Sequence, residues 1–303
     1  MYRFQVPDSM KFRVIIDTDA KNEADDQFAI AHALLTPRFM VKGIIATHFG
    51  KHRTEESMEE SYQECIKVLE LMDMAGQVDI LRSSREAVKS ETDYEYTEGA
   101  QRIVDEALSD DPHRLFVVFL GPLTNLACAY LKNPEIAGRL TAIWIGGGVY
   151  PDGGKEFNLS NDILAANIVM KSGIDLWQVP CNVYTKMKTS LTELQDKVYP
   201  YGKIGKYLFE QMAEFNHIAA TVGVEWFGGE SWSLGDSPAI GLMMNPHEYS
   251  YTLMEAPFID SEMKYHFDGK GRKIRVYHEI DSRFILEDMF VKLRLNYPQN
   301  ECC

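Results

Sequence analysis

The sequence has few of the features that mark secreted, membrane-spanning or nucleic-acid-binding proteins. It contains no run of about 18 uninterrupted apolar residues and no charged-then-apolar leader, so neither membrane spanning nor secretion is expected. Its five cysteines show no metal-binding spacing such as Cys-x-x-Cys, which favours free thiols and a cytoplasmic location. Lysine and arginine number 31 against 45 acidic residues, and the net charge of −14 argues against nucleic acid or an anionic membrane as a partner.

What the chain does contain is an alternation of apolar, strand-like runs with segments of helical periodicity. We expect strands at 13–18, 40–47, 115–120, 141–146 and 174–179, and helices at 24–35, 54–74, 97–109, 123–131 and 161–172. This alternation is typical of parallel βα units, so the predicted fold class is α/β, with a doubly wound sheet flanked by helices. No internal repeat, low-complexity tract or linker interrupts the 303 residues, so 1–303 should form a single domain.

The last third of the sequence follows a different pattern. Residues 190–222 look helical, and 223–237 form an aromatic, glycine-rich segment that contains Trp226 and Trp232. Further helices are expected at 238–245 and 282–294, and the alternation in 272–278 after Asp268-Gly269-Lys270-Gly271 suggests a late hairpin. Because loops of this composition often line binding sites, the aromatic segment is a candidate ligand wall.

The most informative segment is an acidic run directly after the first expected strand. Asp17, Asp19, Glu23, Asp25 and Asp26 fall within ten positions, at the carboxyl end of a strand where α/β folds bind ligands. Carboxylates packed closely raise one another's pKa values, so a cluster that stays ionised needs a counter-charge such as a hard, oxygen-seeking cation. The simpler interpretation is a solvated loop whose acids cap the following helix.

Three later segments could contribute to the same sheet edge. Gly121–Ala127 forms a turn after a strand, Lys155–Asp162 carries Glu156 and Asn158 after a glycine-rich strand end, and Asp236 precedes a helix. Each has a structural interpretation as a turn or a helix cap. Taken together, the side chains of Asp19, Asp25, Asp26 and Asp236 and a Thr124 carbonyl would form a cation site of oxygen ligands.

In this ordered set of motifs, the sequence resembles the inosine-uridine nucleoside N-ribohydrolase family. The resemblance implies a Rossmann-like, mixed but mostly parallel sheet and a Ca²⁺ ion held by Asp19, Asp26, the Thr124 carbonyl and Asp236. It implies that Asp25 is the base that activates water, that Glu156 and Asn158 bind ribose, and that the ligand is a small-molecule nucleoside or related glycoside. The family also implies a homodimer or homotetramer.

The sequence departs from the family pattern at three places. Five residues, rather than three, separate Asp19 from Asp25, so Asn22 and Glu23 could enter the site. Gly50 stands where many members carry an asparagine that contacts ribose, and Gly235 stands where many carry the histidine that protonates the leaving group. Without that histidine, we expect a slight preference for purine nucleosides, stacked on Trp226 or Trp232. His48 and His217 are further candidates for contact with the substrate.

Two alternative functions stay open from the sequence. Asp17-Thr18-Asp19 and Gly235-Asp236-Ser237 resemble motifs of haloacid-dehalogenase phosphatases, in which Asp17 would be the nucleophile, although Lys21 and Ile240 do not fit that pattern. The second alternative is a repurposed, non-catalytic protein that binds a sugar or nucleoside and keeps the cation. The main expectation is Ca²⁺-dependent hydrolysis of the N-glycosidic bond of ribonucleosides.

Overall fold

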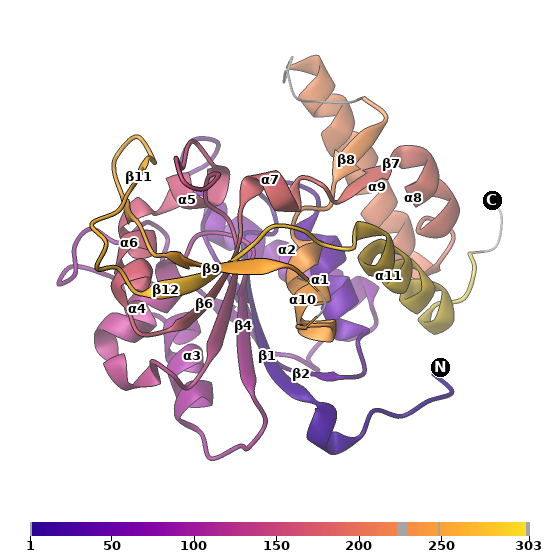
Figure 1. Cartoon of the computed structure of the whole chain (residues 1–303). Coiled ribbons are helices and arrows are strands. Elements are labelled where there is room, and N and C mark those ends of the chain that lie inside the picture. Colours follow the sequence, from indigo (N-terminus) through magenta and orange to yellow (C-terminus); the bar gives the residue numbers. More distant parts are fainter. Residues whose placement is uncertain (1, 223–228, 248, 301–303) are drawn as a thin grey trace.

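An eight-stranded sheet forms the centre of the molecule (Figure 1). The computed structural model describes residues 2–222, 229–247 and 249–300. Neighbouring strands of the sheet are parallel, except that β9 runs antiparallel to β12. Across the sheet the strands are β3 (Ile80–Arg82), β2 (Phe39–Ala46), β1 (Phe12–Thr18), β4 (Leu115–Phe119), β5 (Thr141–Ile145), β6 (Asp175–Val179), β12 (Lys273–Tyr277) and β9 (Tyr251–Glu255).

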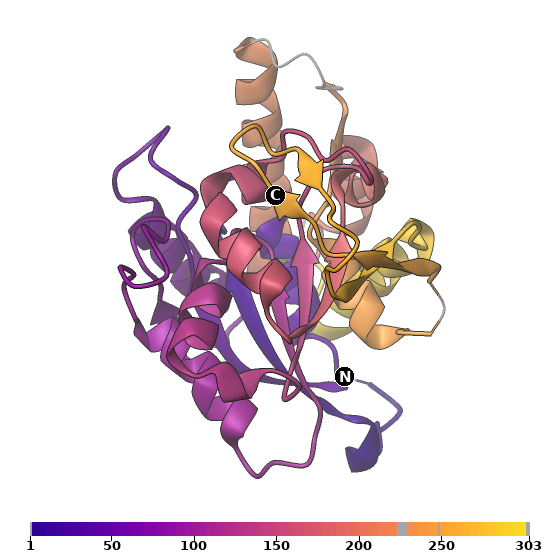
Figure 2. The same cartoon turned by 60° about the vertical axis from the view of Figure 1, so that its left-hand side comes forward.

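Helices cover both faces of this sheet (Figure 2). One face packs against α1 (Asp26–Leu34), α2 (Ser57–Leu71), α10 (Ser237–Met244) and α11 (Ser282–Asn296), and the other against α3 (Glu98–Leu108), α4 (Thr124–Lys132) and α6 (Ile163–Lys171). The remaining elements are η1 (Asp8–Met10), η2 (Pro134–Ile136), α5 (Phe157–Asn161), α7 (Cys181–Tyr184), α8 (Leu191–Lys197), α9 (Gly202–Thr221) and two small antiparallel sheets, β7 (Lys188–Ser190) with β8 (Ser231–Ser233) and β10 (Phe258–Ile259) with β11 (Tyr265–His266).

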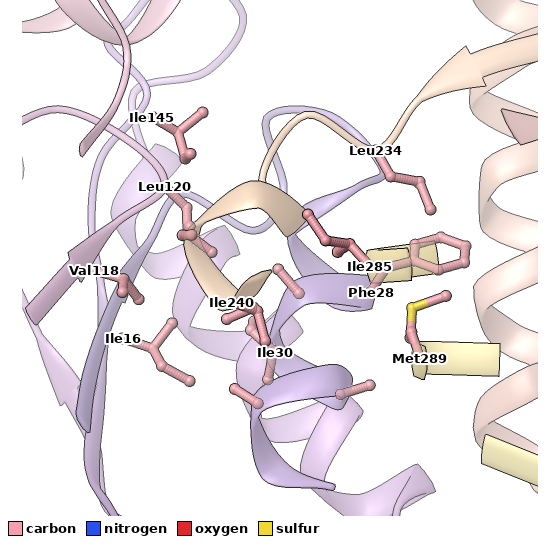
Figure 3. Close-up of a cluster of buried hydrophobic side chains, with 14 of the residues drawn as sticks. Ile16, Phe28, Ile30, Val118, Leu120, Ile145, Leu234, Ile240, Ile285 and Met289 are labelled. Carbon is pink, nitrogen blue, oxygen red and sulfur yellow. The ribbon is translucent and has the colours of Figure 1, made fainter. Parts of the chain in front are cut away.

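The central strands are apolar because both of their faces are buried. In β1, Val14 and Ile16 contribute to the core on one side of the sheet, and Ile15 contributes to the core on the other. Figure 3 shows Ile16 of the sheet on the same side as Ile30 of α1. Each such side chain, when fully buried, stabilises the fold by roughly 1.5–3 kcal/mol. This packing fixes the carboxyl ends of β1, β4 and β5, from which the site is built.

The predicted fold class is confirmed, and the differences concern the later part of the chain. The segment 190–222 is not one helix, because it divides into α8 and α9 on either side of Pro200, which cannot continue a helix. The expected hairpin strand exists as β12, but it joins the main sheet between β6 and β9 and is not half of a tight hairpin. Part of the expected aromatic loop is strand β8, and Trp226 lies outside the described residues. Among the described helices, none has the length and apolar character needed to cross a membrane.

Candidate active site

The acidic loop between β1 and α1 is held by buried polar contacts. The Gln27 side-chain amide donates to the Ala20 carbonyl at 2.5 Å and to a Glu64 carboxylate oxygen at 3.1 Å. From the other side, Gln211 of α9 donates to the Ala24 carbonyl at 2.7 Å. The longer loop is therefore anchored at both of its ends, and Glu64 itself accepts a hydrogen bond from Tyr207 of α9.

Three carboxylates converge at the end of this loop. Asp25 and Asp26 start α1, Asp236 precedes α10, and one oxygen of each lies within 4.8 Å of the others. All three side chains are buried, and so is Asp19, whose Oδ2 atom has no hydrogen-bond partner. A buried acceptor without a partner is costly, which suits a site built for a cation.

The carboxylates of this cluster are unfavourable as neighbouring negative charges. Burial raises the pKa of Asp26 to about 6, although the hydroxyl of Thr18 donates a hydrogen bond to it. Burial, with further contributions from neighbouring carboxylates, raises the pKa values of Asp19, Asp25 and Asp236 well above their usual range. A bound divalent cation would lower the pKa values of these carboxyl groups, because it favours the ionised carboxylates.

Glu156 and Asn158 are positioned by the start of α5. The Glu156 carboxylate caps this helix, accepting from the backbone N–H groups of Asn158 at 3.1 Å and Leu159 at 2.8 Å. The Asn158 amide nitrogen donates to the carbonyl of Leu120, directly after β4, at 2.7 Å and to that of Ile145, the last residue of β5, at 2.8 Å. One side chain therefore ties two strand ends together beside the carboxylates.

Two adjoining cavities open at this sheet edge. The acidic cavity is lined by Asp19, Asn22, Glu23, Asp25, Asp26, Leu120, Ile145, Glu156, Phe157, Asn158, Tyr184, Gly235 and Asp236. The aromatic cavity is lined by Glu23, Asp25, Phe157, Tyr184, Thr185, Lys188, Ser231, Trp232, Ser233 and Gly235. The five shared residues place the two cavities side by side, as a sugar and its attached base would require.

The structure does not bring Thr124 or His48 to either cavity. His48 Nε2 lies 3.0 Å from the Thr124 hydroxyl, and that hydroxyl donates to Asp162 at 2.8 Å, so both side chains belong to a buried network behind the site. Thr124 is already the first residue of α4, whereas Leu120, at the end of β4, lines the acidic cavity. Burial lowers the pKa of His48 to about 4, which keeps its ring neutral.

Of the other predicted contacts, Asn22, Glu23 and Trp232 line one or both cavities, and His217 does not. Asn22 lines the acidic cavity, where its side-chain oxygen accepts from Arg53 at 2.9 Å, and Glu23 lines both cavities. Trp232 lines the aromatic cavity and packs edge-on against Phe215, with ring centroids 5.2 Å apart. His217 is exposed on α9 and lines neither cavity.

Tyr184 is a site residue that the sequence interpretation missed. It lines both cavities, and its hydroxyl donates to Glu156 at 2.9 Å. A Cβ atom on Gly235 would lie 3.0 Å from the Tyr184 ring, so this ring occupies the space into which a side chain at position 235 would extend. Tyr184 follows β6 at the carboxyl edge of the sheet, and that position is the signal that could have identified it.

Asp17, the nucleophile of the phosphatase alternative, lies outside both cavities. Its Oδ2 atom accepts from the Asn125 amide at 2.7 Å, and the side chain is fully buried within β1. Since a nucleophile must reach its substrate, this location argues against the phosphatase.

Comparison with known proteins agrees with this geometry. The sequence model of the inosine-uridine preferring nucleoside hydrolase family matches residues 14–287. Uridine nucleosidase 1 of Arabidopsis thaliana is 28% identical over 232 residues, or 67% of this chain, which spans just under two thirds (66%) of that relative's length. A purine-preferring ribonucleoside hydrolase from Gardnerella vaginalis superimposes with a TM-score of 0.75 at 21% identity, covering 94% of this chain and 98% of that one. A plant nucleoside hydrolase shares the fold equally, with a TM-score of 0.75 at 20% identity over 93% and 98% of the two chains. With most of its length matched by the family model, the chain belongs to the inosine-uridine preferring nucleoside hydrolase family.

Proposed function

We propose that this protein hydrolyses the N-glycosidic bond of ribonucleosides in a Ca²⁺-dependent reaction, giving ribose and the free base. The observation that carries the proposal is the convergence of the buried carboxylates of Asp19, Asp25, Asp26 and Asp236 in one cavity. Glu156 and Asn158 line the same cavity, and an aromatic cavity adjoins it. Family membership supports the reaction class.

The residues present suit a hard divalent cation. Asp19, Asp26 and Asp236 would supply carboxylate oxygens, and the buried Asp19 Oδ2, which accepts no hydrogen bond, suits the role of a cation ligand. For the backbone ligand we favour the carbonyl of Leu120 over that of Thr124, because Leu120 lines the cavity. When bound, the cation would supply positive charge that acidifies water and attracts the ribose hydroxyls.

The reaction itself would be carried by residues of the chain. Asp25 borders both cavities, so it can accept a proton from a water molecule placed between the carboxylates and the anomeric carbon. Breaking the bond develops positive charge on the ribose ring, which the nearby Glu156 carboxylate would stabilise. The Asn158 side chain, fixed by two strand ends, would orient the sugar.

For the base, we propose a slight preference for purine nucleosides. The aromatic cavity offers Phe157, Tyr184 and Trp232 as surfaces against which a flat ring can stack. Relatives differ in the base that their names give, uridine in the Arabidopsis protein and purines in the Gardnerella protein. Base preference is therefore a property to be measured on this chain.

The decisive experiment measures ribose release from a panel of nucleosides, with and without a chelator. Release that stops with chelation and returns with added Ca²⁺ is the expected result. Asp236→Asn should abolish release. Phosphate release from phosphate esters would instead support the phosphatase, and tight nucleoside binding without turnover would support the non-catalytic alternative, which the absence of a side chain at Gly235 keeps open.

The assembly and location of the protein are separate proposals. We propose a homodimer or homotetramer in the cytoplasm, acting on small molecules without a nucleic-acid or membrane partner. The net charge of −14 supports the proposed absence of a nucleic-acid or membrane partner, because an acidic surface repels polyanions. Mass measurement in solution tests the assembly.

A further inference from the structure

We infer that this site selects ribosides whose heterocycle carries a positive charge, such as a pyridinium or a ring-methylated purine, and releases the heterocycle as a neutral base. The inference rests on the proposed hydrolysis and names its substrate class. It is carried by the Glu23 carboxylate, which faces the aromatic cavity from the lengthened acidic loop.

Glu23 adds a negative charge at the place where the base would bind. It lines both cavities, is half-buried, and accepts no side-chain hydrogen bond from the described residues. The guanidinium of Arg53 is the positive group that acts on it, but Arg53 is exposed and donates its hydrogen bonds to Lys21 and Asn22. The carboxylate is therefore available to a ligand.

The charge of the two cavities taken together also favours a cation. Six carboxylates line them: Asp19, Glu23, Asp25, Asp26, Glu156 and Asp236. The opposing group in the lining is Lys188, which is exposed at the surface, where water and salt screen its charge. A divalent cation bound to the aspartates favours their ionised form and offsets two negative charges, so the Glu23 and Glu156 carboxylates keep the potential near the base negative.

The aromatic walls complete a site for a flat cation. Tyr184, Trp232 and Phe157 line the cavity that Glu23 borders. Aromatic faces attract a cation within about 6 Å of the ring, and a nearby carboxylate adds to that attraction. A neutral base would gain the stacking but not the charge interaction.

Among the described lining residues, the donor for the proton that a neutral base needs is not a histidine, and the Lys188 ammonium is exposed at the surface. The Tyr184 hydroxyl already donates to Glu156, and Gly235 has no side chain. A side chain at position 235 would contact Tyr184, because a Cβ atom there would lie 3.0 Å from the Tyr184 ring.

A cationic heterocycle does not need that donor. Water attacks C1′ as the C1′–N bond breaks, and the electron pair of that bond returns to the ring nitrogen and cancels its positive charge. The proton that water loses passes to Asp25 and then to solvent. The products are ribose, the neutral heterocycle and one proton, so charge and atoms balance.

The test compares nicotinamide riboside, which carries a pyridinium, with the neutral nucleosides uridine and inosine. We expect kcat/KM for nicotinamide riboside to exceed the other two by about 10-fold or more in the wild-type protein with Ca²⁺. Glu23→Gln should lower kcat/KM for nicotinamide riboside by about 10-fold, a larger loss than for uridine or inosine. Lys188→Gln, which removes the opposing positive charge, should raise kcat/KM for nicotinamide riboside relative to kcat/KM for uridine and inosine.

Three results would count against the inference. Equal kcat/KM for charged and neutral nucleosides would overturn it while leaving the proposed hydrolysis intact. A larger loss for the neutral nucleosides in Glu23→Gln would identify Glu23 as a proton donor and would also overturn it. If no nucleoside releases ribose, the proposed function fails, and the inference is then tested by calorimetric measurement of nucleoside binding. Binding of nicotinamide riboside that is tighter than that of uridine and inosine, and that loses this advantage in Glu23→Gln, supports charge selection. Equal binding of the three nucleosides rejects it.

Discussion

Asp26 and Asp236 approach each other within 4.8 Å although they lie far apart in the sequence. Asp26 is the first residue of α1, and Asp236 immediately precedes α10. These two helices pack together on the same face of the sheet, so each holds its aspartate beside the other. Two buried carboxylates so close together are unfavourable unless a proton or a cation lies between them.

Removing one of these carboxylates should abolish activity without unfolding the protein. Asp236→Asn deletes a proposed cation ligand and also relieves repulsion within the cluster. We expect kcat/KM to fall at least about 100-fold, since the cation is worth several kcal/mol to the transition state. Thermal unfolding in chelator should show equal or higher stability than wild type. Undiminished ribose release would contradict the assignment.

Asp17 provides the matched comparison within the same acidic segment. Asp17→Ala removes the acceptor of the 2.7 Å hydrogen bond from Asn125 in the core and touches neither cavity. We expect a loss of about 1–3 kcal/mol in the free energy of unfolding, with kcat close to wild type for the folded fraction. A phosphatase would lose all turnover on this change, so complete inactivation of a well-folded variant would favour that alternative.

Without a cation, the protein should become less stable as the pH rises from 4 to 7. The pKa of Asp26 is raised to about 6 and that of Glu23 to about 7, so the folded state holds these protons more tightly than the unfolded state. Their contribution to stability is present at low pH and is lost as the pH rises through these values. Ca²⁺ at 100-fold its Kd should restore about 2.7 kcal/mol at pH 7.5. Urea unfolding with and without chelator measures both effects; equal curves would refute the prediction.

His32 should produce the opposite pH dependence. Burial lowers its pKa to about 4 although Asp288 lies 2.7 Å from Nε2, so the ring is neutral in the folded protein. The unfolded chain takes up this proton below about pH 6.5, and stability should fall by up to about 3 kcal/mol between pH 6.5 and 4. With Ca²⁺ present throughout, His32→Gln should flatten this part of the curve. A variant that keeps the wild-type slope would show that another group is responsible.

Gly235 and Tyr184 should act as a coupled pair. Gly235→Ala places a Cβ atom 3.0 Å from the Tyr184 ring and 3.4 Å from an Asp25 oxygen, so the ring must shift by a few tenths of an ångström, which disturbs its hydroxyl contact with Glu156. We expect a roughly 10-fold loss in kcat/KM, and a similar loss in Tyr184→Phe, which removes the hydroxyl. Because both changes act through the same contact, the double variant should lose less than the sum of the two free-energy changes. Additive losses would argue that the two residues are independent.

Much of the fold could be predicted from local patterns. The apolar runs that became β1, β4, β5 and β6 are buried on both faces, and such strands are visible in a sequence; β2 is buried in its second half. The two small sheets were missed because strands as short as β7 and β8 exist only through their mutual pairing, which no local pattern encodes. Strand β9 is mostly exposed and lacks the apolar run that marks a buried strand.

The candidate site was predictable where chemistry and chain position coincide. Acidic residues at the carboxyl end of a predicted strand can be recognised as site candidates from the sequence. The cavity lining includes the four predicted aspartates, Asp19, Asp25, Asp26 and Asp236. The location of Thr124 could not be deduced, because choosing between carbonyls four residues apart depends on where the strand ends and the helix begins. Tyr184 could not be deduced either, since its contact with Glu156 joins the end of α7 to the start of α5, 28 residues away in the sequence.

Calorimetric titration of the chelator-treated protein with Ca²⁺ tests the central claim most directly. The account predicts one ion bound per chain in the wild-type protein, with ribose release that rises in proportion to the occupied fraction. It also predicts no saturable binding in Asp236→Asn. An absence of binding by the wild-type protein, or unchanged binding by the variant, would contradict it.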